Sequence, residues 1–151
     1  MGSRERVAAF LEKSGASYQL REFDESTRSS ALAAQVLGCT VAEIAKSIVF
    51  VGTRTAVAVV SGDRRVSVRK LSAVIGEARM ANPDEVREKT GFPIGGVPPF
   101  PHSEGVAVLP DVSLTRFEGV WAAAGAPNSV FRMAPPDILR LVGAGPFDLC
   151  E

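Results

Sequence analysis

The sequence holds few of the residues on which metal and redox sites depend. Among its 151 residues there is one histidine, His102, and there are two cysteines, Cys39 and Cys150. A single histidine excludes sites that need two or more imidazole ligands, and neither cysteine stands in a CxxC or comparable ligand spacing. We therefore expect no metal and no cofactor, and two free thiols in a reducing compartment rather than a disulfide.

Net charge and long apolar runs are also missing. The 17 basic side chains balance the 17 acidic ones, so whole-chain charge gives no support for nucleic-acid binding, although a local basic patch is compatible with it. The longest apolar runs, such as 56–60, fall far below the roughly 20 residues of a membrane helix. The first residues lack the apolar core of a signal peptide. We predict a cytoplasmic protein without a membrane partner.

The remaining composition is that of a single globular domain covering residues 1–151. Hydrophobic residues make up 46% of the chain and charged residues 23%, and this length allows a buried core. Helical periodicity and capping residues predict helices at 3–14, 29–37, 70–75, 83–89 and 135–142, with a helical turn at 41–45. Alternating or β-branched runs predict strands at 18–23, 46–51, 55–60, 64–68, 106–109, 119–123 and 129–133.

This order of elements predicts an α+β fold with helices packed outside a barrel-like sheet. The alternation of strands and helices typical of parallel βαβ folds is absent. The runs at 46–51, 55–60 and 64–68 are separated by short turns, which predicts a three-stranded meander. Residues 24–28 are predicted to form a polar loop.

A charge interrupts an apolar run at the start of one predicted strand. Lys46 stands in the sequence Ile44-Ala45-Lys46-Ser47-Ile48-Val49-Phe50. A lysine there either extends to the rim of the strand or points into a cavity, where its ammonium can bind phosphate or polarise a carbonyl. Taken alone, the pattern favours the rim. Ser47 lacks the context of a triad nucleophile.

Glycine and proline dominate the stretch from Thr90 to Ser103, which cannot be a helix or a central strand. Within it, Gly95-Gly96-Val97-Pro98-Pro99-Phe100 combines glycines that let the backbone approach a ligand with prolines that stiffen the loop. Such a loop can present N–H groups to a developing oxyanion. The alternative is a rigid apolar connector packed on the core.

Several polar residues have both a functional and a structural interpretation. His102 follows the loop and is either a proton shuttle, a phosphate contact or a surface histidine. Asn128 is either a hydrogen-bonding group at a pocket mouth or a turn residue. The pairs Arg64-Arg65 and Arg69-Lys70 form a solvated face or, with Arg54, a contact to an RNA backbone.

Together, the lysine-bearing strand and the loop resemble the YbaK/prolyl-tRNA synthetase editing-domain family. The run from Ile44 to Phe50 is similar to the family's lysine strand, and Gly95-Gly96-Val97-Pro98-Pro99 is similar to its GxxxP loop. The resemblance extends from about Val7 to Val142. It implies a mixed, barrel-like sheet ringed by helices.

The same resemblance implies an aminoacyl-tRNA deacylase that clears small non-cognate amino acids, often from tRNA(Pro). Lys46 would bind the 3′-terminal adenosine through phosphate, and the backbone from Gly95 and Gly96 to Pro99 would contact the aminoacyl group or its carbonyl. Further substrate-binding positions would be Ser47, Val97, Pro98, Phe100, His102 and Asn128. Hydrolysis would use a positioned water, assisted by the vicinal ribose hydroxyl, without a protein nucleophile. Aminoacylated tRNA is the expected partner, with prolyl-tRNA synthetase or an elongation factor as further candidates.

The chain departs from the family pattern at two places. Pro101 stands where the family loop commonly continues with glycine, and Ala126-Pro127-Asn128-Ser129 lacks the histidine motif of alanine-specific members and the basic turn of cysteine-specific ones. These differences favour the less specialised trans-editing subgroup. Two competing interpretations stay open: a non-catalytic RNA- or protein-binding regulatory module on the same fold, and a hydrolase for another small acyl ester.

Overall fold

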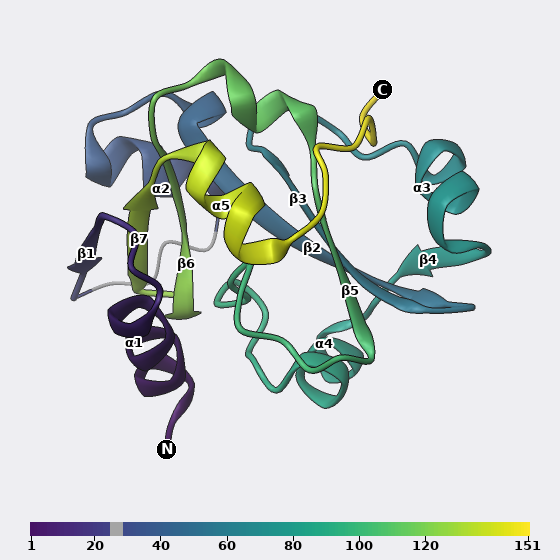
Figure 1. Ribbon diagram of the computed structural model, residues 1–151, viewed down its shortest axis with the longest axis horizontal. Helices are drawn as coiled ribbons and strands as arrows, with labels where there is room; N and C mark the ends of the chain where they lie inside the picture. The colour runs from purple at the N-terminus through teal and green to yellow at the C-terminus, as the bar shows by residue number, and fades with distance from the viewer. Residues whose placement is uncertain (25–28) are drawn as a thin grey trace.

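A mixed sheet forms the centre of the molecule in a computed structural model that describes residues 1–24 and 29–151 (Figure 1). In the described residues seven strands run in the order β1-β7-β6-β2-β3-β5, and β4 pairs with β2 beside this path. The strands are β1 (Tyr18–Glu22), β2 (Ile44–Gly52), β3 (Thr55–Ser61), β4 (Ala78–Met80), β5 (Val106–Pro110), β6 (Val120–Ala126) and β7 (Ser129–Met133).

The sheet is open, and β1 and β5 end its main strand order. An α+β fold with helices around a mixed sheet is confirmed, whereas closure into a barrel-like sheet is not. Two pairs of strands are parallel: β2 with β6, where Ile44 pairs with Trp121, and β3 with β5, where Thr55 pairs with Val106. The sequence pattern missed these parallel pairs because the paired strands lie far apart in the chain, with other helices and strands between them.

The helices are α1 (Ser3–Lys13), α2 (Ser30–Leu37), α3 (Val68–Ile75), α4 (Pro83–Thr90) and α5 (Pro135–Val142). Side-chain caps begin α2, α3 and α4: the Ser29 hydroxyl accepts a hydrogen bond from the Leu32 N–H at 3.1 Å, Ser67 caps α3, and Asn82 and Glu85 form a capping box. In Figure 1, α3 lies at the far end of the sheet from α1. None of the helices in the described ranges is both long and apolar enough to span a membrane.

The predicted strand at 64–68, and with it the meander, is wrong. Val66 makes only an isolated bridge to Cys150, and the chain enters α3 at Val68 after Ser67 caps the helix. The place beside β3 belongs to β5 instead. The predicted helical turn at 41–45 shrinks to a 3₁₀ turn, Val41–Glu43, because Ile44 and Ala45 already pair with β6. Of the predicted loop at 24–28, only residue 24 lies within the described ranges.

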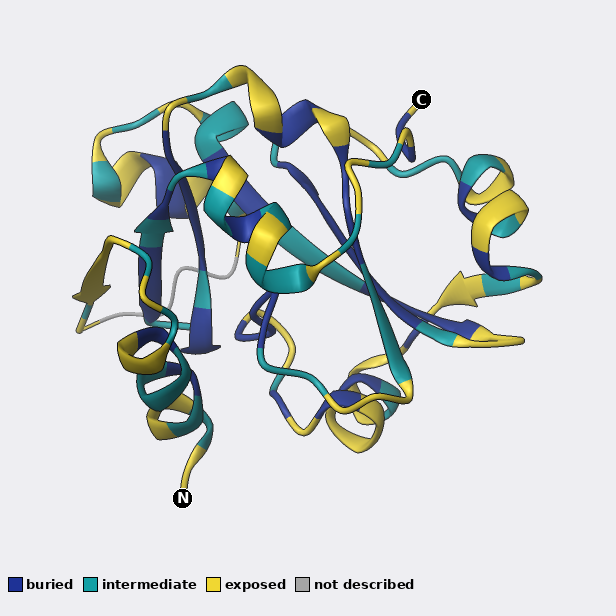
Figure 2. Cartoon of the chain, in the orientation of Figure 1, coloured by how far each residue is buried: buried dark blue, intermediate teal, exposed yellow. Residues whose placement is uncertain are grey.

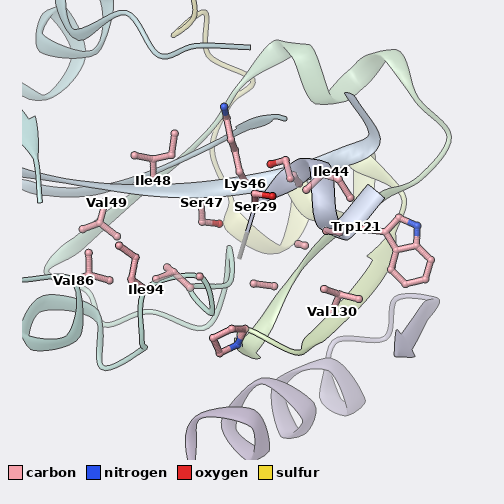
Figure 3. A pocket seen from close by; sticks show the side chains of 18 of the residues that line it. Ser29, Ile44, Lys46, Ser47, Ile48, Val49, Val86, Ile94, Trp121 and Val130 are labelled. Carbon is pink, nitrogen blue, oxygen red and sulfur yellow. The ribbon is translucent and has the colours of Figure 1, made fainter. Parts of the chain in front are cut away.

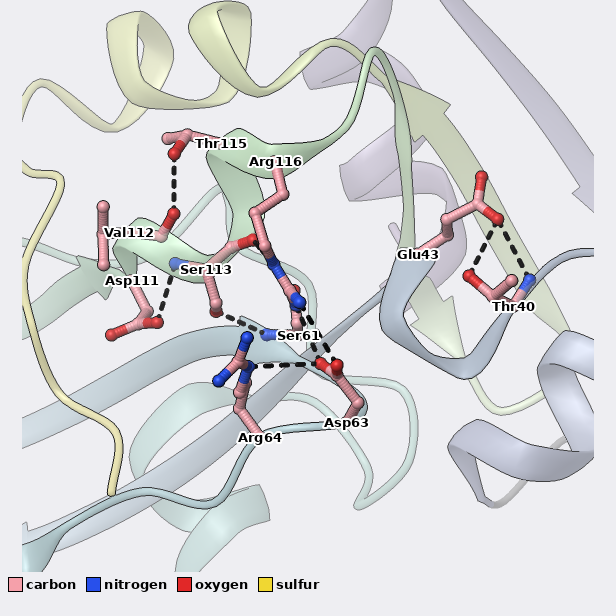
Figure 4. A network of polar contacts seen from close by, with 10 residues as sticks. All are labelled: Thr40, Glu43, Ser61, Asp63, Arg64, Asp111, Val112, Ser113, Thr115 and Arg116. Carbon is pink, nitrogen blue, oxygen red and sulfur yellow. Dashed lines mark hydrogen bonds and ion pairs between the residues drawn. The ribbon is translucent and has the colours of Figure 1, made fainter.

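The most buried strand is β3, whose residues from Ala56 to Val60 are fully shielded (Figure 2). It separates a core cluster under α1 and α4 from a second cluster under α3. The C-terminal segment closes the second cluster, because the buried Asp111 carboxylate accepts a hydrogen bond from Leu149 N–H at 2.7 Å. The same carboxylate accepts one from Ser113 N–H at 2.9 Å (Figure 4). The two cysteines are free thiols.

Candidate active site

A cavity of about 380 Å³ opens beside β2, between the start of α2, α4 and the glycine–proline loop (Figure 3). Ligand pockets are usually of this size or larger. Its walls are mostly aliphatic or aromatic and include Val86, Ile94, Val97, Trp121 and Val130. Such a space accommodates a small, largely apolar group and leaves few polar atoms to orient it.

One wall of the cavity is the strand that carries the predicted lysine. Every residue from Ile44 to Val49 lines the space, Lys46 and Ser47 included. Figure 3 shows Lys46 and Ile48 leaving β2 on the opposite side from Ser47 and Val49, as the alternation of a strand requires. The half-buried Lys46 makes no ion pair within the part of the chain that the structure describes.

The opposite wall is the loop between α4 and β5, which close backbone contacts fix to β6. Gly96 N–H donates to the Pro93 carbonyl at 2.9 Å, and the Gly96 carbonyl accepts from Gly125 N–H at 3.0 Å. A Cβ atom on Gly96 would lie only 2.8 Å from the Ala126 Cα, so no side chain fits there. Gly95 has a φ of +81°, in the left-handed region that favours glycine. The loop therefore offers its backbone to the cavity.

Aromatic side chains support the loop from behind. The Phe100 ring packs on Phe10 of α1, with 4.8 Å between ring centroids, and on Phe131 of β7 at 5.6 Å. His102 bonds through its Nε2 atom to the Pro98 carbonyl at 2.7 Å. These contacts leave the loop little freedom, which suits a backbone that must be positioned before a ligand arrives.

The structure gathers some of the predicted site residues and separates others. Lys46, Ser47, Gly95 and Val97 line the cavity. Pro99, Phe100 and His102 line a second cavity of about 520 Å³ on the far side of the loop. The buried residues Gly96 and Pro98 line neither of these two cavities.

Asn128 belongs to a turn contact. Its side-chain N–H donates to the Phe23 carbonyl at 3.0 Å, and its own carbonyl accepts from Phe23 N–H at 2.8 Å. The neighbouring Pro127 lines the cavity in its place. Asn128 thus acts on the cavity only through the β6–β7 turn that it fixes to the end of β1.

The titratable groups near the site are poor acids, bases or nucleophiles at neutral pH. Burial lowers the pKa of His102, so its imidazole is neutral. Burial, the charge of Asp111 and a hydrogen bond to that carboxylate raise the pKa of the Cys150 thiol to about 12. No cluster of three or more His, Cys, Asp or Glu side chains suited to a metal ion occurs in residues 1–24 or 29–151.

Sequence reasoning missed several residues of the cavity wall. Ser29 was predicted as a helix cap, which it is, but it also lines the cavity mouth. Ile94 and Met80 lie at the same cavity with 57% and 63% of their surfaces exposed, although large apolar side chains are usually covered. No motif marks these residues, because they come together only through long-range folding. Trp121 also lines the cavity. As the single tryptophan of the chain, it is the wall residue that stands out most in the sequence.

Comparisons with known proteins show a similarity to aminoacyl-tRNA editing domains. Residues 24–141 match the family described as the aminoacyl-tRNA editing domain. Over 120 residues, 78% of this chain and 76% of the relative, the sequence is 38% identical to the uncharacterized protein YwhH of Bacillus subtilis (strain 168). Over 147 residues, 92% of this chain and 87% of the relative, it is 25% identical to the multifunctional Ser/Thr-tRNA deacylase ProXp-y of Escherichia coli (strain K12).

Solved structures show the same similarity. A crystal structure of a candidate trans-editing enzyme for prolyl tRNA synthetase matches with a TM-score of 0.90 and 41% identity, covering 100% of this chain and 98% of that one. The hypothetical protein APE2540 matches with a TM-score of 0.90 and 28% identity, covering 97% of this chain and 99% of that one.

Proposed function

Because the chain belongs to the aminoacyl-tRNA editing domain family, we propose that it is a deacylase that hydrolyses the ester bond of mischarged aminoacyl-tRNA in trans. The observation that carries the proposal is the cavity that Lys46 and Ser47 share with Gly95 and Val97. Lys46 on one face of β2 supplies a contact for the nucleic acid, and the fixed backbone of the loop at the cavity supplies a contact for the acyl group.

We assign Lys46 to the 3′-terminal adenosine, where its ammonium binds phosphate as a point charge. The backbone of the loop at Gly95 contacts the aminoacyl group and stabilises the oxyanion that forms on the ester carbonyl. The attacking group is a water held by the bound substrate and assisted by the vicinal ribose hydroxyl. His102 and Cys150 are not among the residues that line the cavity, and the Ser47 hydroxyl at its wall has no hydrogen-bond partner among the described residues that could act as its base. Both observations support a reaction without a protein nucleophile.

The proposed substrate carries a small amino acid, with tRNA(Pro) as the first candidate tRNA. Support comes from the structural relative described as a candidate trans-editing enzyme for prolyl tRNA synthetase and from the apolar walls of the 380 Å³ cavity. A hydrophobic pocket separates substrates that differ by one methylene by only about 1–3 kcal/mol. We therefore expect several small amino acids to be cleared at different rates. The relative named as a Ser/Thr-tRNA deacylase makes serine and threonine part of the range to be tested.

A panel of charged tRNAs tests the proposal. The protein is incubated with tRNA(Pro) carrying alanine, cysteine, serine, threonine or 2-aminobutyrate, with seryl-tRNA(Thr), and with correctly charged prolyl-tRNA(Pro) as the control. Loss of the ester is followed against buffer alone. We expect turnover of at least one mischarged tRNA and slow turnover of the control. Absence of turnover across the panel would overturn the deacylase assignment and favour a non-catalytic RNA- or protein-binding module.

A further inference from the structure

The cavity occupies a place in the sheet where a strand is missing beside β2. β6 pairs with β2 only at Ile44 and Ala45, and β4 pairs with it only from Phe50 to Gly52. Between these two ladders every residue up to Val49 lines the cavity, although successive side chains of a strand point to opposite faces. The cavity therefore contacts the backbone edge of β2.

The direction of the peptide groups follows from two hydrogen bonds on β2. The Ile44 carbonyl accepts from Gly62 N–H at 2.7 Å on the edge that faces β3, whereas the Val49 carbonyl accepts from Ala81 N–H at 2.9 Å on the other edge. Backbone groups alternate between the two edges along a strand. Ser47 stands two residues before Val49, so its N–H and its C=O both face the cavity.

Among the residues that the structure describes, no ladder and no hydrogen bond pairs the polar groups of Ser47 on that edge. In the described part of the chain neither the β6 ladder nor the β4 ladder reaches Ser47. Its buried hydroxyl oxygen also has no hydrogen-bond partner in the same residues. Buried backbone and side-chain polar groups are nearly always paired. A cavity wall with a free donor and a free acceptor on one residue is suited to a ligand that offers the complementary pair.

We propose, on the premise that the chain is the deacylase described above, that the aminoacyl group binds as one residue of the missing strand. Its α-ammonium donates a hydrogen bond to the Ser47 carbonyl, and Ser47 N–H donates to the ester carbonyl. Two residues of an antiparallel pair exchange the same two bonds. An α-aminoacyl ester carries its donor and its acceptor on either side of one carbon atom, as a residue of a strand does.

This binding mode names the substrate class and one catalytic contact. Recognition through the main chain accepts any α-amino acid and rejects acyl esters without the amine, while the apolar walls select the size of the side chain. Negative charge develops on the ester carbonyl oxygen during hydrolysis. The N–H of Ser47 therefore contributes to catalysis as well as to binding, together with the backbone of the loop.

Substrates that differ only in the amine test the proposal. Alanyl-tRNA(Pro) is compared with propionyl-tRNA(Pro), and seryl-tRNA(Pro) with 3-hydroxypropionyl-tRNA(Pro). Because an α-ammonium activates the ester by itself, each enzymatic rate is divided by the rate in buffer. We expect the desamino substrate to lose roughly 10- to 100-fold in normalised kcat/KM, the range for a hydrogen bond to a charged group. Equal normalised rates would overturn the proposal.

A binding measurement separates this contact from the chemistry. The probes are 3′-amino-3′-deoxyadenosine molecules whose 3′ nitrogen carries L-alanine or propionate in amide linkage, which the protein cannot hydrolyse as esters. We expect the propionyl amide to bind roughly 10- to 100-fold more weakly. Equal dissociation constants for the two amides would contradict recognition of the amine.

Variants at Ser47 separate the main chain from the side chain. Proline removes the N–H that faces the cavity and leaves the β2–β3 ladder complete, because proline is tolerated where the N–H of a strand is unpaired. We expect Ser47→Pro to fold, judged by circular dichroism, and to lose activity on alanyl- and seryl-tRNA(Pro). Ser47→Ala keeps both main-chain groups, so its preference for alanyl over propionyl substrate should equal that of the wild type. Loss of this preference in Ser47→Ala would assign recognition to the hydroxyl and overturn the proposal.

Different results would contradict the deacylase function and the main-chain recognition of the amine. A wild-type protein that hydrolyses alanyl-tRNA(Pro) and propionyl-tRNA(Pro) equally well retains the deacylase function and loses the main-chain recognition. A wild-type protein that hydrolyses no ester of the panel loses the deacylase function itself. Should Ser47→Pro not fold, the substrate pairs and the amide probes still decide the question with the wild-type protein.

Discussion

The guanidinium of Arg6 lies over the ring of Phe92, with its central carbon 4.4 Å from the ring centroid. The same side chain donates a hydrogen bond of 2.9 Å to the Gly91 carbonyl. Gly91 ends α4, and Phe92 is a fully buried anchor of the loop that follows. The first helix of the chain therefore fixes the start of the loop that forms one wall of the cavity, although α1 itself does not line that cavity.

Replacing Arg6 should loosen the loop and slow the reaction. Arg6→Ala removes a cation–π contact and a charged hydrogen bond, so we expect a loss of about 1–3 kcal/mol in the free energy of unfolding. We also expect a lower kcat for deacylation in conditions where the variant is fully folded. Arg4→Ala on the same helix is the matched control, since its ion pair with Glu22 is exposed and worth about 0–1 kcal/mol. Unchanged kcat in Arg6→Ala would show that the loop needs no support from α1.

Lys46 should contribute to activity and not to stability. It makes no ion pair among the described residues, so Lys46→Ala should change the free energy of unfolding by less than about 0.5 kcal/mol. Loss of a charged contact to the nucleic acid should lower kcat/KM by roughly 10- to 100-fold. Single-turnover deacylation and chemical denaturation measure the two effects. A large loss of stability would instead assign the lysine a structural role.

Lys70 provides the opposite case on the same protein. Its ammonium bonds to the Cys150 carbonyl at 2.7 Å and to the Asp148 carboxylate at 3.0 Å, and Lys70 does not line the cavity. We expect Lys70→Ala to lower the free energy of unfolding by about 1–2 kcal/mol and to keep the wild-type kcat/KM. The reverse pattern in the two lysine variants would contradict the assignment of Lys46 to the site.

Local signals in the sequence predicted the elements well. Asn82 before Pro83, Ser29 before α2 and Gly38 after it mark helix ends through short-range hydrogen bonds or a left-handed φ, so they can be recognised without the fold. The strand at 64–68 failed because Ser67 caps a helix, and a short run with Val66 and Val68 has no periodicity that separates strand from helix start.

The site was predictable only as far as the family motifs reach. Lys46 and Gly95 stand in those motifs and do share a cavity, and the family itself is confirmed by the match over residues 24–141. Their partners Ile94 and Trp121 depend on how β6 and the loop pack against β2, which no local pattern records. The missing strand beside Ser47 is a property of two ladders that stop short of it, and register between distant strands is set by tertiary packing.

Gly96 should tolerate no side chain. A Cβ atom there would lie 2.8 Å from the Ala126 Cα and 2.9 Å from its N atom, and backbone atoms cannot move aside as a flexible side chain can. Gly96→Ala should therefore cost about 1–3 kcal/mol of stability and displace the loop from β6, with a loss of deacylase activity. Gly105→Ala is the matched control, because its Cβ would meet nothing within 4 Å. Equal thermal stability of the two variants would contradict the close approach.

Glu85 should link the stability of the cavity wall to pH. It lies in the first turn of α4, next to Val86 of the wall. Hydrogen bonds from Arg79 and from the Asn82 N–H lower the pKa of its carboxyl from an ordinary value of 4.5 to about 2. A carboxyl whose pKa is depressed by folding stabilises the protein fully above its unfolded pKa and loses that contribution as pH falls through the folded pKa. The contribution should thus be constant above about pH 5 and fade between pH 4.5 and pH 2.

Unfolding by urea across this range tests the link. The difference in free energy of unfolding between the wild type and Glu85→Gln should be largest near neutral pH and should shrink toward pH 2, because the wild-type carboxyl then becomes protonated and resembles the amide. Glu88→Gln, at an exposed position of the same helix, controls for the removal of one negative charge. A difference that grows as pH falls would have the wrong sign for a depressed pKa, and it would mean that the bond to Arg79 does not stabilise α4.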